Sequence, residues 1–258
     1  MSADVEFHGA PPTHLRFPTL TALGLWHAST TRHCPGIAHP AEPTSPVGRE
    51  TAALLATPTA LDLSCVAFLR QVHGAAVRRV ARGGNAGEGD VLVTTRPELP
   101  LAVFTADCLA VILFDPAGQR LALAHVGWRG TVKAAARAAV GALVSAGARP
   151  GGLVAAISPS IGPCCYEVDR PVIEPLSAAF PERWEEWARP AGPAKWRLDL
   201  WAATQSQLRD AGVLAERIFN PRLCTACRRD LFFSYRKEGS SGRLVTLAAL
   251  AGRRAAEA

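Results

Sequence analysis

Four apolar segments in the middle of the chain constrain its fold more than any other feature of the sequence. None of them contains Asp, Glu, Lys or Arg, and turn-forming residues lie between them, notably Pro97, Pro100 and the run at 115–118. Segments of this length and composition predict buried core strands. The four segments are 91–94, 101–104, 109–114 and 121–125.

Helical patterns alternate with these segments. The alanine-rich segment 131–146 predicts a helix that ends at Gly147, and the segment 198–211 predicts another that ends at Gly212. Because helices and strands alternate while short turns also join strand to strand, the sequence predicts a mixed α/β domain with a large sheet. Short strands and loops are expected up to Pro46, a helix at 51–56, strands at 65–69 and 153–157, and a core strand at 232–236 with Arg236 turned into a pocket.

The composition excludes several classes of protein. With 258 residues, 48% hydrophobic and 19% charged, the chain can bury a large core, which excludes a disordered protein. The longest uncharged stretch, 150–166, contains three prolines and three glycines, so no membrane-spanning helix is predicted. Residues 1–7 carry Asp4 and Glu6 where a secretory signal would be basic, so a cytoplasmic protein is expected. There the seven cysteines are expected to be thiols, metal ligands or core residues.

The positive charge of the chain points to small anions as partners. The formal net charge is +6, but only three residues are lysines and no basic run is longer than two. Nucleic-acid-binding proteins usually cluster their basic residues, so no nucleic acid is expected. Phosphate and other small anions fit the charge better.

Three potential metal ligands lie at the ends of predicted buried strands. His73 follows the strand at 65–69, Cys108 lies between two strands, and His125 ends a fourth. Two imidazoles and one thiolate suit a catalytic zinc, which keeps a position for water and lowers the pKa of that water to about 7. The alternative is that both histidines are satisfied core residues and that Cys108 is a small buried hydrophobe.

Asp107 and Arg129 are the candidates for proton transfer and anion binding. Asp107 could carry protons to and from a leaving group. If residues 107 and 108 both lie in an extended strand, however, their side chains point to opposite faces, and Asp107 would orient other groups instead. Arg129 belongs to the segment Trp-Arg-Gly at 128–130, which directly precedes the predicted helix at 131–146. The first amides of that helix, with Arg129, could hold an anion. A surface arginine is the alternative.

Cys224 and Cys227 form a CxxC motif that could be half of a metal or redox site. No second CxxC exists in the sequence, and the vicinal pair Cys164 and Cys165 is expected to be a poor partner for tetrahedral coordination. Cys224 and Cys227 are therefore assigned to structure.

Six motifs resemble, in this order, those of the YfiH/laccase-domain family. The resemblance extends from Leu69 to Leu250. The motifs are Gln-Val-His-Gly at 71–74, Gly-Asp-Val-Leu-Val-Thr at 89–94, Thr-Ala-Asp-Cys at 105–108, Ala-His-Val-Gly-Trp-Arg-Gly at 124–130, Ile-Gly-Pro-Cys-Cys-Tyr-Glu-Val at 161–168 and Phe-Phe-Ser-Tyr-Arg at 232–236.

The resemblance implies a fold, a cofactor and an activity. The fold would be a single α/β/β/α layered domain over 1–258 with a mixed sheet, related to bacterial cysteine-dependent toxin deamidases. One zinc per chain would be bound by His73, Cys108 and His125. Family members are described as purine nucleoside phosphorylases acting on adenosine, inosine and methylthioadenosine, with adenosine deaminase activity, so purine nucleosides and phosphate are the expected partners. Older descriptions call such proteins copper-dependent polyphenol oxidases.

The sequence departs from the family pattern over residues 1–45. The family's Thr-Arg-x-Gly-Gly segment is only partly retained at 31–36, and its Leu-Asn-Leu-Gly segment is missing. Arg32 lies in the retained part and is a candidate for lining the substrate pocket.

Other functions remain to be weighed against this one. A true laccase needs on the order of ten histidines for its copper sites, and the chain has seven; a lone copper could still occupy the zinc site. The His-x-Glu and Pro-Cys-x-x-Cys motifs of zinc nucleobase deaminases are absent, so deamination would rest on a different architecture. The alternatives are a cysteine hydrolase, in which His125 activates Cys108, and a partner-binding protein with a vestigial site.

Overall fold

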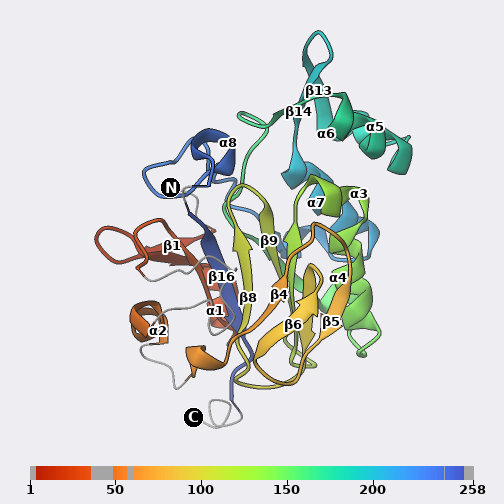
Figure 1. Ribbon diagram of the computed structural model, residues 1–258. Helices are drawn as coiled ribbons and strands as arrows, with labels where there is room; N and C mark the ends of the chain where they lie inside the picture. The colour runs from red at the N-terminus through yellow and green to blue at the C-terminus, as the bar shows by residue number, and fades with distance from the viewer. Residues whose placement is uncertain (1–3, 36–48, 57–60, 241, 253–258) are drawn as a thin grey trace.

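Two large β-sheets packed face to face form the centre of the molecule (Figure 1). The computed structural model describes residues 4–35, 49–56, 61–240 and 242–252. The predicted mixed α/β class is confirmed. The residue pattern suggested one large sheet, whereas the structure has two, in the layered arrangement that the family resemblance implied.

The first large sheet combines strands from both ends of the chain. Strand β4 runs parallel to β6 and β8, while the other neighbours are antiparallel. The order is β1 (Glu6–His8), β2 (His14–Arg16), β3 (Trp26–Thr30), β16 (Leu244–Ala249), β8 (Leu101–Thr105), β4 (Ala67–Arg70) and β6 (Gly84–Glu88).

The second large sheet is built mainly from the middle of the chain. Its order is β15 (Ile218–Phe219), β11 (Val154–Ile157), β9 (Leu109–Asp115), β10 (Arg120–Val126), β7 (Val91–Thr94) and β5 (Val77–Arg79). A small third sheet, with the order β12 (Glu167–Val168), β14 (Lys195–Leu198) and β13 (Ala188–Gly192), extends away from the two large ones (Figure 1).

Helices cover the outer faces of both large sheets. Helix α4 packs on the second sheet and α7 packs against α4, while the first sheet carries Leu55 of α2 and Leu63 on its outer face. Within the described residues, no helix combines the length and the apolar character needed to cross a bilayer. The helices are α1 (Pro18–Ala22), α2 (Arg49–Ala56), α3 (Trp128–Val132), α4 (Ala135–Val144), α5 (Arg170–Ala179), α6 (Trp184–Trp187), α7 (Leu200–Asp210) and α8 (Tyr235–Glu238), with short 3₁₀ turns at Leu63–Cys65, Pro150–Gly152 and Ala215–Arg217.

The apolar strands supply two different cores because successive side chains point to opposite faces. In β9, Val111 and Leu113 pack toward α4 and α7, whereas Ile112 and Phe114 pack between the two large sheets. Both faces are therefore buried, which explains the uninterrupted apolar character of the segment. Burying each such side chain stabilises the fold by roughly 1.5–3 kcal/mol.

The strands that carry the site were predicted closely. Strand β7 has the predicted bounds, and β8, β9, β10 and β11 differ from prediction by at most one residue at each end. The helix predicted at 131–146 is instead two helices, because Ala134 between α3 and α4 has a left-handed φ of +55°. Arg129 therefore lies inside the first turn of α3.

The prediction of a core strand at 232–236 is wrong. Phe232 is fully buried among the residues between the sheets, but it lies in a loop. Helix α8 begins directly afterwards, and the backbone N–H of Ser234 donates to Glu238 Oε2 at 3.1 Å. An apolar run of this length can be buried without strand pairing, and the adjacent helix start determines its conformation.

Candidate metal centre and active site

The predicted ligands His73, Cys108 and His125 converge at one end of the space between the two large sheets. His73 follows β4 of the first sheet, and His125 lies near the end of β10 in the second. Cys108 lies in the connection from β8 to β9, which passes from one sheet to the other. Ligand atoms of the three side chains lie within 4.8 Å of one another.

Backbone geometry allows this close approach. His73 adopts a left-handed φ of +55°. A Cβ atom at Gly127 would lie 2.8 Å from Cys108 Sγ and 3.3 Å from His73 Cδ2. Gly127 is thus required because a side chain there would occupy the space in which the ligands meet.

Asp90 orients two of the three predicted ligands and was not singled out from the sequence. Its fully buried carboxylate accepts hydrogen bonds from His125 Nδ1 at 2.8 Å and from the backbone N–H of His73 at 2.9 Å. It also accepts from the N–H groups of Gly74 at 2.6 Å and Val72 at 3.3 Å. The bond to Nδ1 leaves Nε2 of His125 available to a ligand. The sequence contained one indication of this role, because Asp90 is an acidic residue directly before a buried strand.

The half-buried Cys108 and the buried His125 favour opposite charges. Burial alone would raise the pKa of Cys108, but the charge of His125 and hydrogen bonds from both histidines lower it to about 6. Burial opposes the charged form of His125 as well, yet Cys108 and Asp90 raise its pKa to about 9. A thiolate is the form of cysteine that binds metals and the form that attacks carbonyl groups.

The three ligands open into a cavity of about 770 Å³. This volume falls in the usual range for small-molecule sites. Its lining combines aromatic and basic residues, so it suits a flat ligand with an anionic group. The lining residues beside the three ligands include Gln71, Phe104, Asp107, Trp128, Arg129, Tyr166, Tyr235, Arg236 and Arg243.

Asp107 lines the same cavity as Cys108. Neither residue lies in a strand, and Asp107 has a φ of +91°, so the alternation expected for extended backbone does not apply. The two oxygens of its carboxylate accept hydrogen bonds from Thr225 Oγ1 at 2.6 Å and from the backbone N–H of Arg236 at 2.7 Å. These bonds fix the carboxylate at the wall of the cavity.

The three arginines predicted to bind substrate have different surroundings. Arg129 lies over the ring of Trp128, and within the described residues its guanidinium makes no hydrogen bond or ion pair, so its donors can face a ligand. Arg236 lies over the ring of Tyr166 and donates to the carbonyl of Glu167 at 2.5 Å. Arg32 does not line the cavity; its Nη2 pairs with Glu238 Oε1 at 2.9 Å. Arg243 lines the cavity and was not predicted.

Comparisons with known proteins give relatives of this chain. A family described as multi-copper polyphenol oxidoreductase laccase matches residues 43–251. The purine nucleoside phosphorylase YlmD of Geobacillus stearothermophilus is 35% identical over 196 residues, which are 71% of this chain and 70% of the relative. An adenosine deaminase from an unknown prokaryotic organism is 37% identical over 158 residues, which are 61% of this chain and 60% of the relative.

Solved structures show the same fold. The crystal structure of a Bacillus licheniformis YfiH protein superposes with a TM-score of 0.84 at 27% identity, covering 96% of this chain and 99% of the other. The structure of YlmD from Geobacillus stearothermophilus gives a TM-score of 0.82 at 28% identity, covering 95% and 99%.

Proposed function

Because the chain belongs to the YfiH/laccase-domain family, we propose that it is a zinc-dependent purine nucleoside phosphorylase that also deaminates adenosine. Its substrates would be adenosine, inosine and methylthioadenosine, together with phosphate. The observation that carries the proposal is the convergence of His73, Cys108 and His125 on a cavity that also exposes Arg129.

The donor set fits a catalytic zinc. Two imidazoles and one thiolate form the three-residue protein shell that catalytic zinc sites use, and this shell leaves one position open to a ligand. Asp90 fixes the ring of His125 as carboxylates do in such sites. When bound, zinc would act as a Lewis acid and lower the pKa of a coordinated water to about 7. Copper could bind the same donors where it is supplied.

The residues around the cavity would bind and orient the two reactants. The aromatic rings of Phe104, Trp128 and Tyr166 offer surfaces for the purine base. Burial raises the pKa of Tyr166, so its hydroxyl stays protonated and can donate a hydrogen bond to a purine nitrogen. Arg129 would hold phosphate against C1 of the ribose by charge-assisted hydrogen bonds.

Protons must also be moved in both reactions. Phosphorolysis forms a bond from a phosphate oxygen to ribose C1 and breaks the bond from C1 to the purine nitrogen, which takes up a proton. Deamination adds the oxygen of water at C6, and the amine takes up a proton and leaves as ammonia. Asp107 is our candidate proton carrier because its carboxylate is fixed at the cavity wall near Cys108. A cytoplasmic location, where thiols stay reduced, would suit the need for a free Cys108.

A second function is favoured by one specific observation. Cys108 and His125 lie within 4.8 Å of each other, and their opposed pKa shifts would favour, without metal, a thiolate–imidazolium pair of the kind that cysteine hydrolases use to attack amides and esters. Zinc would occupy that thiolate and remove it as a free nucleophile. Metal dependence therefore separates the two functions.

The test is a product assay on adenosine with zinc-loaded protein, with and without phosphate. We expect adenine and ribose 1-phosphate only when phosphate is present, and inosine whether or not it is present. Both activities should be lost in Cys108→Ala. Cys65→Ser, which changes an exposed cysteine outside the site, should retain both. If zinc-loaded protein converts no purine nucleoside, and metal-free protein hydrolyses an amide or ester in a reaction that zinc inhibits, the cysteine hydrolase is correct.

A further inference from the structure

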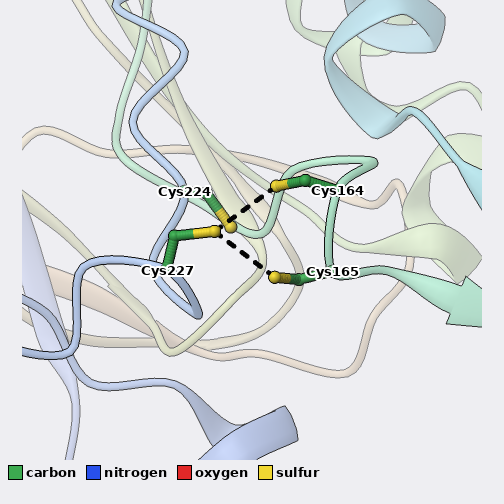
Figure 2. Close-up of side chains that lie close together, drawn as sticks. All are labelled: Cys164, Cys165, Cys224 and Cys227. Carbon is green, nitrogen blue, oxygen red and sulfur yellow. Dashed lines mark hydrogen bonds between the residues drawn. The ribbon is translucent and has the colours of Figure 1, made fainter.

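A second group of four cysteines lies outside the site described above. Figure 2 shows Cys164 and Cys165 on one loop and Cys224 and Cys227 on another, with their sulfurs directed toward one another. All four Sγ atoms lie within 4.8 Å of one another. Cys227 Sγ lies 3.6 Å from Cys164 Sγ and 3.4 Å from Cys165 Sγ. The expectation that the vicinal pair is a poor partner for the CxxC motif is therefore wrong in its geometry.

A tight turn brings both vicinal cysteines to the same side. The backbone N–H groups of Cys165 and Tyr166 both donate to the carbonyl of Gly162 at 3.0 Å. In a strand, consecutive side chains would point to opposite faces, but a turn removes that restriction. Gly162 lets this turn pack against Trp201, because a Cβ there would lie 2.5 Å from the ring of Trp201.

Backbone bonds hold the two loops in register. Ser160 donates its N–H to the carbonyl of Leu223 at 3.1 Å, and Thr225 donates its N–H to the carbonyl of Ser160 at 3.1 Å. The N–H of Gly162 also donates to Cys224 Sγ at 3.3 Å. An N–H that donates to a sulfur orients it and stabilises negative charge on it, as the groups around metal-bound thiolates do.

We propose that Cys164, Cys165, Cys224 and Cys227 bind a structural zinc ion, separate from the one at His73, Cys108 and His125. Zinc–sulfur bonds of about 2.3 Å in a tetrahedron place the sulfurs about 3.8 Å apart. Cys227 Sγ lies 3.6 and 3.4 Å from the sulfurs of Cys164 and Cys165, and all four sulfurs lie within 4.8 Å of one another. Four protein ligands leave no position for a substrate, which is the pattern of a structural site. A disulfide would join only two of the four sulfurs, and Cys227 approaches both Cys164 and Cys165.

The site would connect two walls of the active-site cavity. Thr225 lies between the two cysteines of the CxxC motif and donates to Asp107, while Tyr166 follows Cys165 and lines the cavity. A zinc ion shared by the two loops would fix Asp107 and Tyr166 relative to each other. Its function is therefore to hold the cavity in shape, and it takes no part in the chemistry.

The experiment is a metal count by elemental analysis on protein purified without added metal and under reducing conditions. We expect about two zinc ions per wild-type chain and one in Cys108→Ala, whose remaining zinc would be the four-cysteine site. Cys224→Ser with Cys227→Ser should also retain one zinc, and Cys65→Ser, the matched control on an exposed cysteine, should retain two. In cobalt-substituted Cys108→Ala, the thiolate-to-cobalt absorption expected of four sulfur ligands reports on the site without any activity assay.

The Cys108→Ala variant keeps the proposal testable even if the double serine variant does not fold. A Cys108→Ala protein that is folded by circular dichroism and contains no zinc overturns the proposal. Iron in place of zinc overturns the assignment of the metal. A mass two hydrogens below that of the reduced chain, in metal-free protein prepared under the same conditions, identifies a disulfide instead.

Discussion

Asp90 is the residue on which the orientation of the proposed metal ligands most depends. Every group that its carboxylate contacts is a donor: His125 Nδ1 and the N–H groups of Val72, His73 and Gly74. In Asp90→Asn, the new amide N–H₂ would face one of these donors. We expect the affinity for zinc at this site to fall by roughly 10–100-fold, the usual cost of losing such an orienting group.

The measurement is a competition titration of zinc against a chelator, in a background of Cys224→Ser with Cys227→Ser so that only one site is read. Asp115→Asn is the control, because Asp115 pairs with Arg120 away from the metal ligands. Unchanged zinc affinity in Asp90→Asn would show that the backbone alone sets the ligand geometry.

Arg129 is predicted to serve phosphorolysis more than deamination. Its donors make no other hydrogen bond within the described residues, so phosphate would provide their charge-assisted partner. Arg129→Ala should cost the phosphate-dependent reaction about 1–3 kcal/mol in kcat/KM and the deamination less. Arg137→Ala, on an exposed position of α4, is the control. Equal losses in both reactions would remove Arg129 as the phosphate ligand.

His27 connects strand β3 to the start of helix α1 through hydrogen bonds, and these bonds require its ring to be neutral. Its Nε2 accepts from the N–H of Phe17 at 2.7 Å, and its Nδ1 donates to the carbonyl of Leu25 at 3.0 Å. Burial lowers the pKa of His27 to about 4 from an unfolded value of 6.5. Between these values the unfolded chain binds a proton that the folded chain does not, so stability falls as the pH falls below 6.5.

This contribution can be measured by urea unfolding at pH 7 and pH 5. From the two pKa values, His27 should make the free energy of unfolding about 2 kcal/mol lower at pH 5. In His27→Gln, whose amide can both accept and donate, the pH dependence should be smaller by that amount. Other titrating groups, His14 included, remain in both proteins. The same pH dependence in both proteins would exclude His27 as the cause.

The strands, helices and turns differ in how well the sequence predicts them. Strands buried on both faces leave a plain apolar signal, so β7 to β11 were predicted closely. The sequence also predicted that His73, Cys108 and His125 lie close together, whereas their role as metal ligands stays a prediction. Ala134 breaks a helix whose composition gives no warning, since alanine is the best helix former. The convergence of the four cysteines depends on two turns far apart in the chain, and sequence spacing contains no information on how such turns meet.

The two large sheets share one core. Residues from both sheets, and from both ends of the described chain, pack in the layer between them. Strand β16, near the C-terminus, lies between β3 and β8, so the first sheet is not complete without distant segments. We propose that the described residues fold as one cooperative unit, and the layer between the sheets is where this is best tested.

Ile112 is the position for that test, because it lies in β9, packs between the two sheets and is 1% exposed. Ile112→Ala should lower the free energy of unfolding by about 2–5 kcal/mol through lost burial and a residual cavity. Leu214→Ala, at a 44% exposed position, should change it by less than about 0.5 kcal/mol.

Unfolding is followed in chelated protein by far-ultraviolet circular dichroism, which reports on the backbone, and by tryptophan fluorescence, which reports on packing. If the two sheets unfold together, the two probes give one coincident transition and the same shift in Ile112→Ala. Two separate transitions would show that the two sheets unfold independently of each other.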